Sequence, residues 1–347
     1  MKSRMNAKVS VIIPAYNAAG EIGRVVKSVL GQTHTELELI VVDDGSKDDT
    51  AAVLAELARS EPRMHMLRIP NSGPAAARNR GIEAISPDAD YVMFADADDY
   101  LAPDAIEYAL SAADEAELVL MGFTIENPDG SRRDYFEPQT VYDASTLGDA
   151  LPQLYKANML NQVWAKLFSA RLIRDGGMRF LNYRWGEDRL FIFDCLERAA
   201  KVSVLPECKY FYVMHEGESL ITRFYEHKLE ACCLADSRMQ QLCSMFGTAD
   251  DSGCRYMFVK SIFSCMTNMF SPSCQLGYRG KREYVRHILK NQQVQQRSSH
   301  VFGGRSVQLM CAVLHTKCVA LNMFMFRMVA FMGRFAPKLF MSLKHQK

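Results

Sequence analysis

The sequence predicts an α/β fold in which a mostly parallel, Rossmann-like sheet carries helices on both faces. Four short, mainly apolar runs occur within the first hundred residues, and the first of them, VSVII, is β-branched and apolar as expected of a strand buried on both faces. Between them lie segments whose apolar residues recur at helical spacing, and this alternation is typical of a parallel sheet. The predicted strands are 9–13, 37–42, 64–69 and 91–95, and the predicted helices are 21–30, 50–59 and 75–85.

Acidic residues follow two of these strands at the point where each strand ends. Asp43 and Asp44 close the second strand, and Asp96, Asp98 and Asp99 follow the fourth. The carboxyl ends of parallel strands meet at the sheet edge where open α/β sheets bind ligands. Because close carboxylates repel one another, a cation among them is expected, and oxygen ligands suit Mg²⁺ or Mn²⁺. The alternative is that Asp99 only caps the next helix.

The sequence lacks the signature motifs of several classes of nucleotide-binding protein. The chain has neither G-x-G-x-x-G after the first strand nor G-x-x-x-x-G-K-S/T, which argues against a dinucleotide oxidoreductase and a P-loop NTPase. A nucleotidyltransferase, which also joins an α/β sheet to metal-binding acids, normally has a basic, Gly-rich loop after the first strand. The segment 14–20 (PAYNAAG) contains no basic residue, so this alternative is weaker.

Charge is divided unevenly along the chain. Residues 279–347 hold 13 Lys and Arg against one acid, a net charge of +12, whereas residues 1–278 have a net charge of −11. The basic residues are spread among apolar ones, which favours an anionic membrane surface and no nucleic acid. The most hydrophobic stretch, 307–335, is interrupted by polar residues and is not expected to span a membrane. Packing on the core or forming a homodimer is the alternative.

The rest of the sequence indicates a reduced, cytoplasmic location. The ten cysteines show no zinc-type spacing, and the apolar run at the start of the chain is too short for a signal peptide. Within the second half, 118–125 predicts a further strand, the turn at 127–130 a hairpin, and 126–145 a polar, loop-like segment.

Four motifs resemble, in order and spacing, the N-terminal half of family 2 glycosyltransferases, which are GT-A-fold enzymes that use nucleotide sugars. They are VSVIIPAYNAAGEI at 9–22, VVDDGSKDDT at 41–50, NSGPAAARNRGIE at 71–83 and FADADD at 94–99. The resemblance covers about residues 8–105, is looser over 106–225 and is absent beyond. It implies a catalytic domain over 1–225, with a nucleotide-binding half (8–105) and an acceptor-binding half (106–225). A basic, Met-rich helical region, 226–347, follows.

The resemblance implies residues for the nucleotide half of the donor. Pro14 and Tyr16 match the Pro-x-Tyr-Asn turn beside the base, and Asp44 matches the acid that contacts uracil. Arg78 matches the arginine of the A-A-R-N segment near the nucleotide, with a solvated helix residue as the alternative.

The resemblance also implies residues for the diphosphate and its metal. Asp96 matches the first acid of the D-x-D motif, near the ribose, and Asp98 matches the acid that binds the metal. Lys166 would neutralise diphosphate charge, or is an ordinary surface lysine. His215 follows a predicted strand at 210–213 and is a third metal ligand, a diphosphate contact or a loop histidine without chemistry.

A third acidic motif, Gly-Glu-Asp at 186–188, precedes an apolar helix. Acids are favoured at a helix N-terminus by the helix dipole, so capping is one explanation. Inverting sugar transfer needs a base, usually a carboxylate, for the attacking hydroxyl. Family 2 enzymes with a W-x-K-L-F segment, here 164–168, followed by Gly-Glu-Asp resemble this arrangement. The resemblance implies that Asp188 is the general base, and Glu187 would orient it or bind acceptor hydroxyls. Trp164 would stack on a sugar ring or belong to the core.

These inferences combine into one functional hypothesis. The chain is expected to be a metal-dependent, inverting glycosyltransferase that moves a sugar from a nucleotide-diphospho-sugar, with a UDP-sugar expected, to a hydroxyl of a glycan or lipid-linked glycan. Its expected location is the cytoplasm, peripheral on the inner face of the cell membrane. A degenerate, non-catalytic sugar- or nucleotide-binding scaffold is the main alternative.

Overall fold

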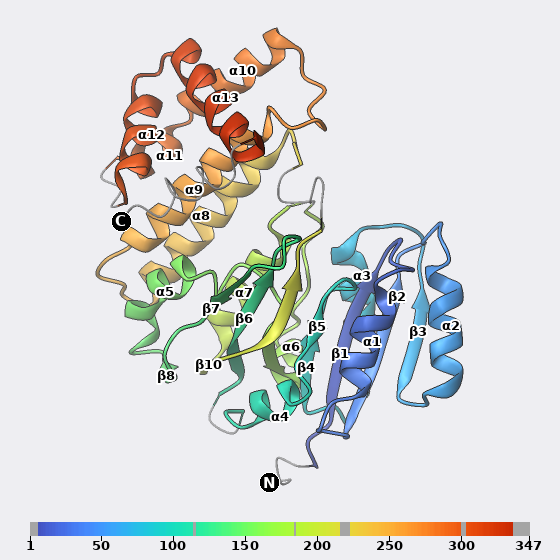
Figure 1. Ribbon diagram of the computed structural model, residues 1–347. Coiled ribbons are helices and arrows are strands. Elements are labelled where there is room, and N and C mark those ends of the chain that lie inside the picture. The colour runs from blue at the N-terminus through green and yellow to red at the C-terminus, as the bar shows by residue number, and fades with distance from the viewer. Residues whose placement is uncertain (1–5, 114–115, 184, 216–222, 300–302, 336–347) are drawn as a thin grey trace. The chain divides into compact units, whose positions relative to one another are not determined.

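The computed structural model describes residues 6–113, 116–183, 185–215, 223–299 and 303–335 (Figure 1). The chain divides into two compact units, which are treated separately below. The first unit comprises residues 1–150 and 157–215, and the second comprises residues 151–156 and 216–347.

Ten strands of the described residues form one mixed sheet in the first unit. The strand order is β3-β2-β1-β4-β9-β6-β10-β5, with β7 paired to β6 and β8 paired to β10. The strands are β1 (Val9–Ala15), β2 (Leu37–Asp43), β3 (Met64–Arg68), β4 (Tyr91–Phe94), β5 (Tyr100–Leu101), β6 (Leu118–Glu126), β7 (Arg132–Tyr135), β8 (Thr140–Asp143), β9 (Lys166–Ser169) and β10 (Lys201–Val213). The four predicted strands of the first hundred residues are confirmed as β1 to β4.

Most strands along the main path of this sheet run in one direction, and β9 and β5 run against it. β1 pairs in parallel with β2 and β4, and β2 pairs in parallel with β3. β9 runs antiparallel between β4 and β6, and β10 is again parallel to β6. The prediction of a mostly parallel sheet is therefore confirmed for its first half. The carboxyl ends of β1, β2 and β4 share one edge, where their acidic residues follow.

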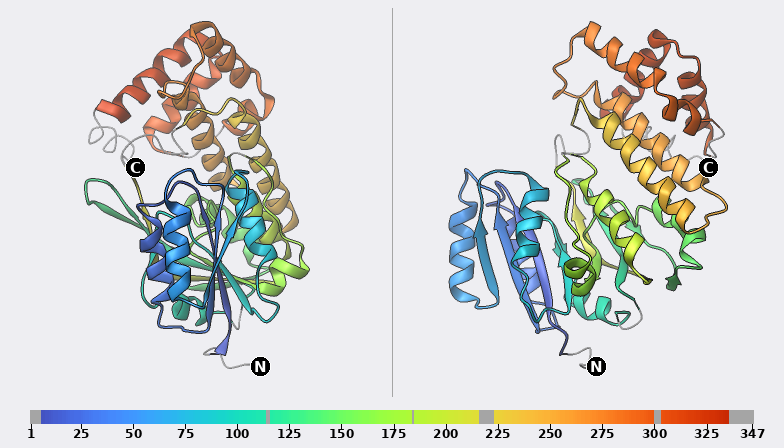
Figure 2. Two further views of the ribbon diagram at one scale, coloured as in Figure 1. Left: turned by 90° about the vertical axis from the view of Figure 1, so that its right-hand side faces the viewer. Right: turned by 180° about the vertical axis from the view of Figure 1, so that it is seen from behind.

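Helices cover both faces of the sheet. α1 (Ile22–Leu30) and α2 (Thr50–Ser60) contact each other on one face, and α3 (Pro74–Glu83) packs against β1 and β2 from the other (Figure 2). α3 approaches closely because Gly81 has no side chain: a Cβ there would lie 2.4 Å from Cγ2 of Ile12. The remaining helices are α4 (Ala105–Leu110), α6 (Ala170–Asp175), α7 (Glu187–Arg198) and α5 (Leu147–Lys156), in which the boundary between the units falls.

Four aromatic rings fix α7 against the sheet. Phe191 of α7 stacks on Phe180, with ring centroids 4.0 Å apart, and meets Phe94 and Phe168 edge-on at 5.8 and 5.9 Å. Such pairs are favourable beyond the apolar area that they bury. Phe94 ends β4 just before the acidic residues, and Phe191 lies one helical turn after Asp188. The cluster therefore brings the first turn of α7 toward the acidic end of β4.

The segment 126–145 differs from the prediction of a loop. β7 and β8 occupy parts of it, β7 in a hairpin with β6 and β8 antiparallel to β10. The turn at 127–130 is formed as predicted, with Gly130 at a φ of 79°. The first three residues of β7 are charged and exposed, and β8 exposes Val141 and Asp143, so neither strand has the apolar pattern from which a strand is predicted.

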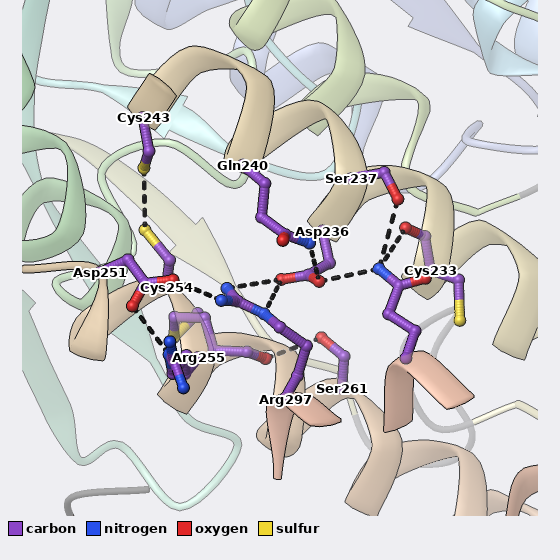
Figure 3. A network of polar contacts seen from close by, with 12 residues as sticks. Cys233, Asp236, Ser237, Gln240, Cys243, Asp251, Cys254, Arg255, Ser261 and Arg297 are labelled. Atoms are coloured by element: carbon purple, nitrogen blue, oxygen red, sulfur yellow. Dashed lines mark hydrogen bonds and ion pairs between the residues drawn. The ribbon is translucent and has the colours of Figure 1, made fainter. Parts of the chain in front are cut away.

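The second unit is helical over its described residues, which confirms the predicted C-terminal helical region. Its helices are α8 (Lys228–Met245), α9 (Ser252–Asn268), α10 (Tyr278–Lys290), α11 (Gln292–Arg297), α12 (Arg305–His315) and α13 (Val319–Phe335). Arg297 is buried and joins two helices by pairing with Asp236 of α8, at 2.9 Å, and with Asp251 at the start of α9 (Figure 3). Among the described residues, the helices are too short or too polar to cross a bilayer.

Candidate active site

The loops after β1 and β2 form one connected surface at the carboxyl edge of the sheet. The backbone N–H of Asp44 donates to the carbonyl of Ala15 at 2.8 Å, and the N–H of Asn17 donates to the Ser46 hydroxyl at 2.9 Å. These bonds hold the turn that contains Pro14 and Tyr16. The Tyr16 side chain is 45% exposed, so its ring is available to a flat ligand. Its contact with a base stays a prediction.

The carboxylate of Asp44 is buried and accepts hydrogen bonds from the backbone. Its two oxygens accept from the N–H groups of Ser72 and Gly73 at 2.7 and 2.8 Å, which ties the end of β2 to the turn before α3. Asp43 is also buried and lies 3.2 Å from Nε of Arg68. Asp44 therefore shapes the loops around the expected nucleotide site, and its predicted contact with uracil remains untested.

Arg78 of α3 is the centre of the site. Its side chain is 5% exposed, and its Nη1 lies 2.7 Å from Oδ1 of Asp188 and 3.6 Å from Oε1 of Glu187. Its Nη2 lies 2.9 Å from Oδ1 of Asp96, and its guanidinium lies over the ring of Phe180. The alternative of a solvated helix residue is therefore wrong for Arg78. One arginine brings together acids from both halves of the unit, and 110 positions in the sequence separate it from Asp188.

The acids around Arg78 have perturbed affinities for protons. Burial raises the pKa of Asp188 to about 7, although the charge of Arg78 opposes this shift and that of Glu187 adds to it. Burial also raises the pKa of Glu187, again against the effect of Arg78. Left-handed Gly186, with a φ of 83°, starts α7 and carries both acids into its first turn. A carboxylate with a pKa near 7 can accept a proton at neutral pH.

Lys166 of β9 is buried beside this cluster. It is 1% exposed, and its ammonium donates to the carbonyl of Trp164 at 3.3 Å. Burial lowers the pKa of Lys166 to about 7, and the charge of Asp188 opposes that shift. The alternative of an ordinary surface lysine is thus wrong. A diphosphate contact stays a prediction, and a buried lysine without a functional partner is costly.

Trp164 belongs to the core. It is 7% exposed, and its ring stacks on Tyr210 with centroids 4.7 Å apart and on Tyr212 at 5.4 Å. Of the two explanations considered for Trp164, the core position is the one observed, because its faces are taken by tyrosines of β10.

The acidic turn after β4 is tied to β10 by a tyrosine that sequence reasoning missed. The Tyr210 hydroxyl accepts from the backbone N–H of Asp96 at 3.0 Å and donates to Oδ2 of Asp99 at 2.5 Å. Asp99 is fully buried and also accepts from the N–H of Val213 at 2.9 Å. Asp99 therefore does not cap a helix but links the turn to the end of β10. The Tyr-x-Tyr pattern of that strand was the available signal.

This link places His215 near Asp98. Nε2 of His215 lies 3.3 Å from Oδ2 of Asp98, and both side chains are roughly half exposed. Burial, followed by the charge of Asp96, raises the pKa of Asp98. Within the described part of the chain, no three His, Cys, Asp or Glu side chains are grouped closely enough to form a metal site by themselves. The Asp98 carboxylate nevertheless fits Mg²⁺ or Mn²⁺, because Mg²⁺ in particular often binds one or two carboxylates plus substrate phosphates, whereas an imidazole suits other divalent ions better.

Asn79, next to Arg78, has a structural role. Its side-chain amide donates to the carbonyl of Phe180 at 2.8 Å and accepts from the N–H of the same residue at 2.8 Å. The pair anchors the segment before α7 to α3. Asn79 thereby supports the geometry around Arg78.

Comparisons with known proteins agree with this geometry. Residues 10–174 match the family model of glycosyl transferase family 2. The chain is 28% identical over 209 residues to the uncharacterized glycosyltransferase EpsJ of Bacillus subtilis (59% of this chain, 60% of EpsJ). It is 28% identical over 251 residues to the succinoglycan biosynthesis protein ExoO of Rhizobium meliloti, covering 70% of each. The alignments span under two thirds of EpsJ and of EpsH of Bacillus subtilis, 60% and 64%.

A solved structure has a similar fold. The crystal structure of S. aureus TarS 1–349 in complex with UDP-GlcNAc gives a TM-score of 0.65 at 20% identity, covering 94% of this chain and 91% of that one. At this identity the likeness concerns the fold. The region 10–174 thus matches glycosyl transferase family 2, and the first unit has the GT-A fold.

Proposed function

We propose that this chain is a glycosyltransferase of the hexosyltransferase type, which moves a sugar from a nucleotide-diphospho-sugar to a hydroxyl of a glycan or lipid-linked glycan. The observation that carries the proposal is the cluster in which Arg78 joins Asp96 of the donor half to Glu187 and Asp188 of the acceptor half. The first unit would be the catalytic domain. A UDP-sugar is the proposed donor, because the TarS structures that share its fold hold UDP-GlcNAc and UDP.

Donor binding would use the carboxyl edge of the sheet. Exposed Tyr16, with Pro14, would contact the base, and Asp44 would both contact the base and hold the loops around it. Asp96 would lie near the ribose. Lys166, whose ammonium is buried near Asp188, would meet the negative charge of the diphosphate, since a buried lysine gains most from an anionic partner.

Asp188 would act as the general base. With a pKa of about 7 it is largely ionised at slightly alkaline pH and binds a proton strongly enough to take one from an acceptor hydroxyl. The deprotonated oxygen would attack the anomeric carbon as the bond to the diphosphate breaks, from the face opposite the leaving group, so the configuration inverts. Arg78, 2.7 Å away, would hold Asp188 in position, and Glu187 would keep its pKa high.

Asp98, with Asp96 and His215 beside it, would hold Mg²⁺ or Mn²⁺. Such an ion neutralises charge that builds up on a leaving diphosphate. Oδ2 of Asp98 and Nε2 of His215, which lie 3.3 Å apart, would supply an oxygen and a nitrogen ligand.

Nucleotide release tests the proposal. The purified full-length chain is incubated with Mn²⁺ and a panel of UDP-, GDP- and dTDP-sugars, beside Asp98→Ala, Asp188→Ala and the surface control Asp175→Ala. We expect slow hydrolysis of one donor, lost in EDTA and in Asp98→Ala and unchanged in Asp175→Ala. Asp188→Ala should still bind that donor but fail to transfer its sugar once an acceptor is present. If no donor binds or raises the melting temperature, a non-catalytic scaffold replaces this proposal.

We propose that the second unit attaches the enzyme to the cytoplasmic, anionic face of the cell membrane. Large apolar side chains of α12 and α13 are exposed, with Leu309 at 63% and Phe324 at 66%. Leu321, Phe324 and Met328 recur at i, i+3 and i+7, so they share one face of α13. Exposed Lys317 lies in the turn between the two helices. Helices of this kind bind at a lipid interface by their apolar face and their cations.

Vesicle flotation tests this attachment. The full-length chain should float with anionic phosphatidylglycerol vesicles at low salt and much less with neutral phosphatidylcholine vesicles. Phe324→Ser should reduce flotation, whereas Ala312→Ser, at an exposed position of α12 that carries only a small side chain, should not. Equal binding to both vesicle types, or none, contradicts the proposal. A mass near twice 39.2 kDa in light scattering, lost in Phe324→Ser, would instead assign the face to a homodimer.

A further inference from the structure

Four cysteines form two facing pairs on the hairpin of α8 and α9. Sγ of Cys232 lies 3.8 Å from Sγ of Cys265, and Sγ of Cys243 lies 3.8 Å from Sγ of Cys254. The two cysteines of α8 and the two of α9 are separated by the same number of residues, about three helical turns. The pairs are therefore two matching levels of one antiparallel hairpin. A disulfide is about 2.05 Å long, so each pair is in contact but not bonded.

The Cys243–Cys254 pair lies where α8 ends and α9 begins, in surroundings that favour a thiolate (Figure 3). The Thr248 side chain hydrogen-bonds to Cys243, and the charge of Arg297 acts on both sulfurs. Arg297 is itself fixed by two aspartates, so its position beside the pair is set by the fold. A hydroxyl donor and a cation next to a thiol are features of oxidisable cysteines.

The two thiols of this pair differ in their affinity for a proton. The hydrogen bond between the two sulfurs, in which either can be the donor, is the main cause that lowers the pKa of Cys243. Thr248 and Arg297 add to this shift, and burial and the charge of Asp251 oppose it. The same hydrogen bond, together with burial, raises the pKa of Cys254. Cys243 is also the member that reaches the surface, at 7% exposure, whereas Cys254 is fully buried. Of the two sulfurs, the more exposed one, Cys243, is therefore the one that an oxidant in solution meets first.

The deeper pair provides a comparison within the same hairpin. Cys232 and Cys265 are 1% and 0% exposed, so an oxidant in solution does not reach them while the hairpin is closed. The distance between their sulfurs is the same as in the other pair. A difference in reactivity between the pairs would therefore reflect access and surroundings, and not separation.

We propose that Cys243 and Cys254 form an oxidisable dithiol, which a peroxide converts to a disulfide that closes the tip of the α8–α9 hairpin. The Cys243 thiolate attacks one peroxide oxygen, the O–O bond breaks, and the other oxygen leaves as an alcohol or water after protonation. Cys243 is then a sulfenic acid. Cys254 attacks its sulfur, the S–O bond breaks, and the hydroxide leaves as water with the Cys254 proton. One peroxide is reduced for each pair of thiols oxidised.

Peptide mapping tests this site on the full-length chain. The protein is exposed to hydrogen peroxide, samples are alkylated over time, and unreduced digests are analysed by mass spectrometry. We expect a Cys243–Cys254 linked peptide, lighter by two hydrogens, together with the loss of two alkylatable thiols and full reversal by dithiothreitol. The Cys232–Cys265 link should form later. Absence of the Cys243–Cys254 link, or its formation no earlier than the deeper one, overturns the proposal and leaves the four residues as core cysteines.

Two variants assign the roles within the pair. Cys254→Ser removes the resolving thiol, so a sulfenic acid should accumulate at Cys243 and be trapped by dimedone. Cys243→Ser should form neither the adduct nor the disulfide. Cys311→Ser changes another buried cysteine and should oxidise with the kinetics of the unaltered chain. A dimedone adduct on Cys254 in Cys243→Ser, with none on Cys243 in Cys254→Ser, would contradict the assigned roles. The peptide map of the unaltered chain decides the site even if a variant does not fold.

Discussion

Replacing Arg78 by methionine tests the central cluster without any substrate. The change removes the cation that lies 2.9 Å from Asp96, 2.7 Å from Asp188 and 3.6 Å from Glu187, while keeping an unbranched side chain. Breaking a buried ion pair by removing one partner costs about 3–5 kcal/mol, because the other charge stays buried without compensation. For a unit of this size each kcal/mol lowers Tm by about 2–4 °C, so Arg78→Met should melt roughly 6–20 °C lower.

The loss should also depend on pH in a defined direction. Arg78 opposes the raised pKa of Asp188, so the folded pKa of Asp188 in Arg78→Met should lie above the value of about 7 in the unaltered chain. Below pH 7 Asp188 is protonated in both folded proteins and contributes no difference. Above pH 7 the folded variant still binds that proton while its unfolded state does not. The deficit should therefore widen by up to about 1.4 kcal/mol per pH unit until the new pKa is passed.

Thermal unfolding of both proteins between pH 6 and 9 measures this effect. Arg80→Met is the matched control, because Arg80 lies on the same helix but is 46% exposed and pairs with Glu83 at the surface. The free energy of unfolding of Arg80→Met should differ from that of the unaltered chain by less than about 0.5 kcal/mol at every pH. The reasoning is refuted if Arg78→Met melts like the control, or if its deficit stays constant between pH 7 and 9.

Three further predictions concern the first unit. The kcat/KM of the transferase should rise with pH through about 7 as Asp188 ionises, and Glu187→Gln should move this midpoint to lower pH, since Glu187 helps to raise the pKa of Asp188. Gly81→Ala should destabilise by about 1–3 kcal/mol in urea unfolding because its Cβ would meet a side chain at 2.4 Å, whereas Gly23→Ala, with open space around it, should be neutral or stabilising by up to about 1 kcal/mol. Lys166→Met should raise Tm below pH 7, where the buried lysine is charged, and the gain should shrink as the pH approaches 10.5, while transfer activity falls.

Local patterns predicted much of the fold, because each pattern lies within a few residues. β1, β2 and β4 are short, mainly apolar runs, and such runs predict strands buried on both faces without knowledge of their partners. β7 and β8 contain no such run, because three charged residues begin β7 and only two residues of β8 are apolar. They become strands through pairing with β6 and β10. Local sequence patterns therefore predicted the strands of the nucleotide-binding half more fully than those of the acceptor-binding half.

The site was only partly predictable because its contacts join distant positions. Asp96 and Asp188 could be named from their motifs, but nothing in the sequence said that one arginine contacts both. The burial of Lys166 follows from the strand it occupies between β4 and β6, and a single Lys within an apolar segment does not reveal that position. The bond from Tyr210 to Asp99 spans 111 positions and is likewise a product of tertiary packing.

Two comparisons distinguish helix capping from catalysis as the role of Asp188. One is the size of the free-energy terms, and the other is the direction in which a substitution changes Tm with pH. A capping acid at a helix N-terminus gains about 0.3–1 kcal/mol from the dipole and has a lowered pKa. Asp188 instead pairs with Arg78, and burial raises its pKa from 3.8 to about 7, a cost of up to about 4 kcal/mol at alkaline pH.

Asp188→Asn removes that cost. Its Tm relative to the unaltered chain should therefore rise between pH 4 and pH 7, the range in which the unfolded chain loses the Asp188 proton and the folded chain keeps it. A capping role predicts the reverse, since the lost interaction would be strongest once the acid is ionised. Thermal unfolding at pH 5 and pH 8 separates the two. A relative gain with pH, combined with loss of transfer, means that the acid is kept at a cost in stability for the reaction it performs.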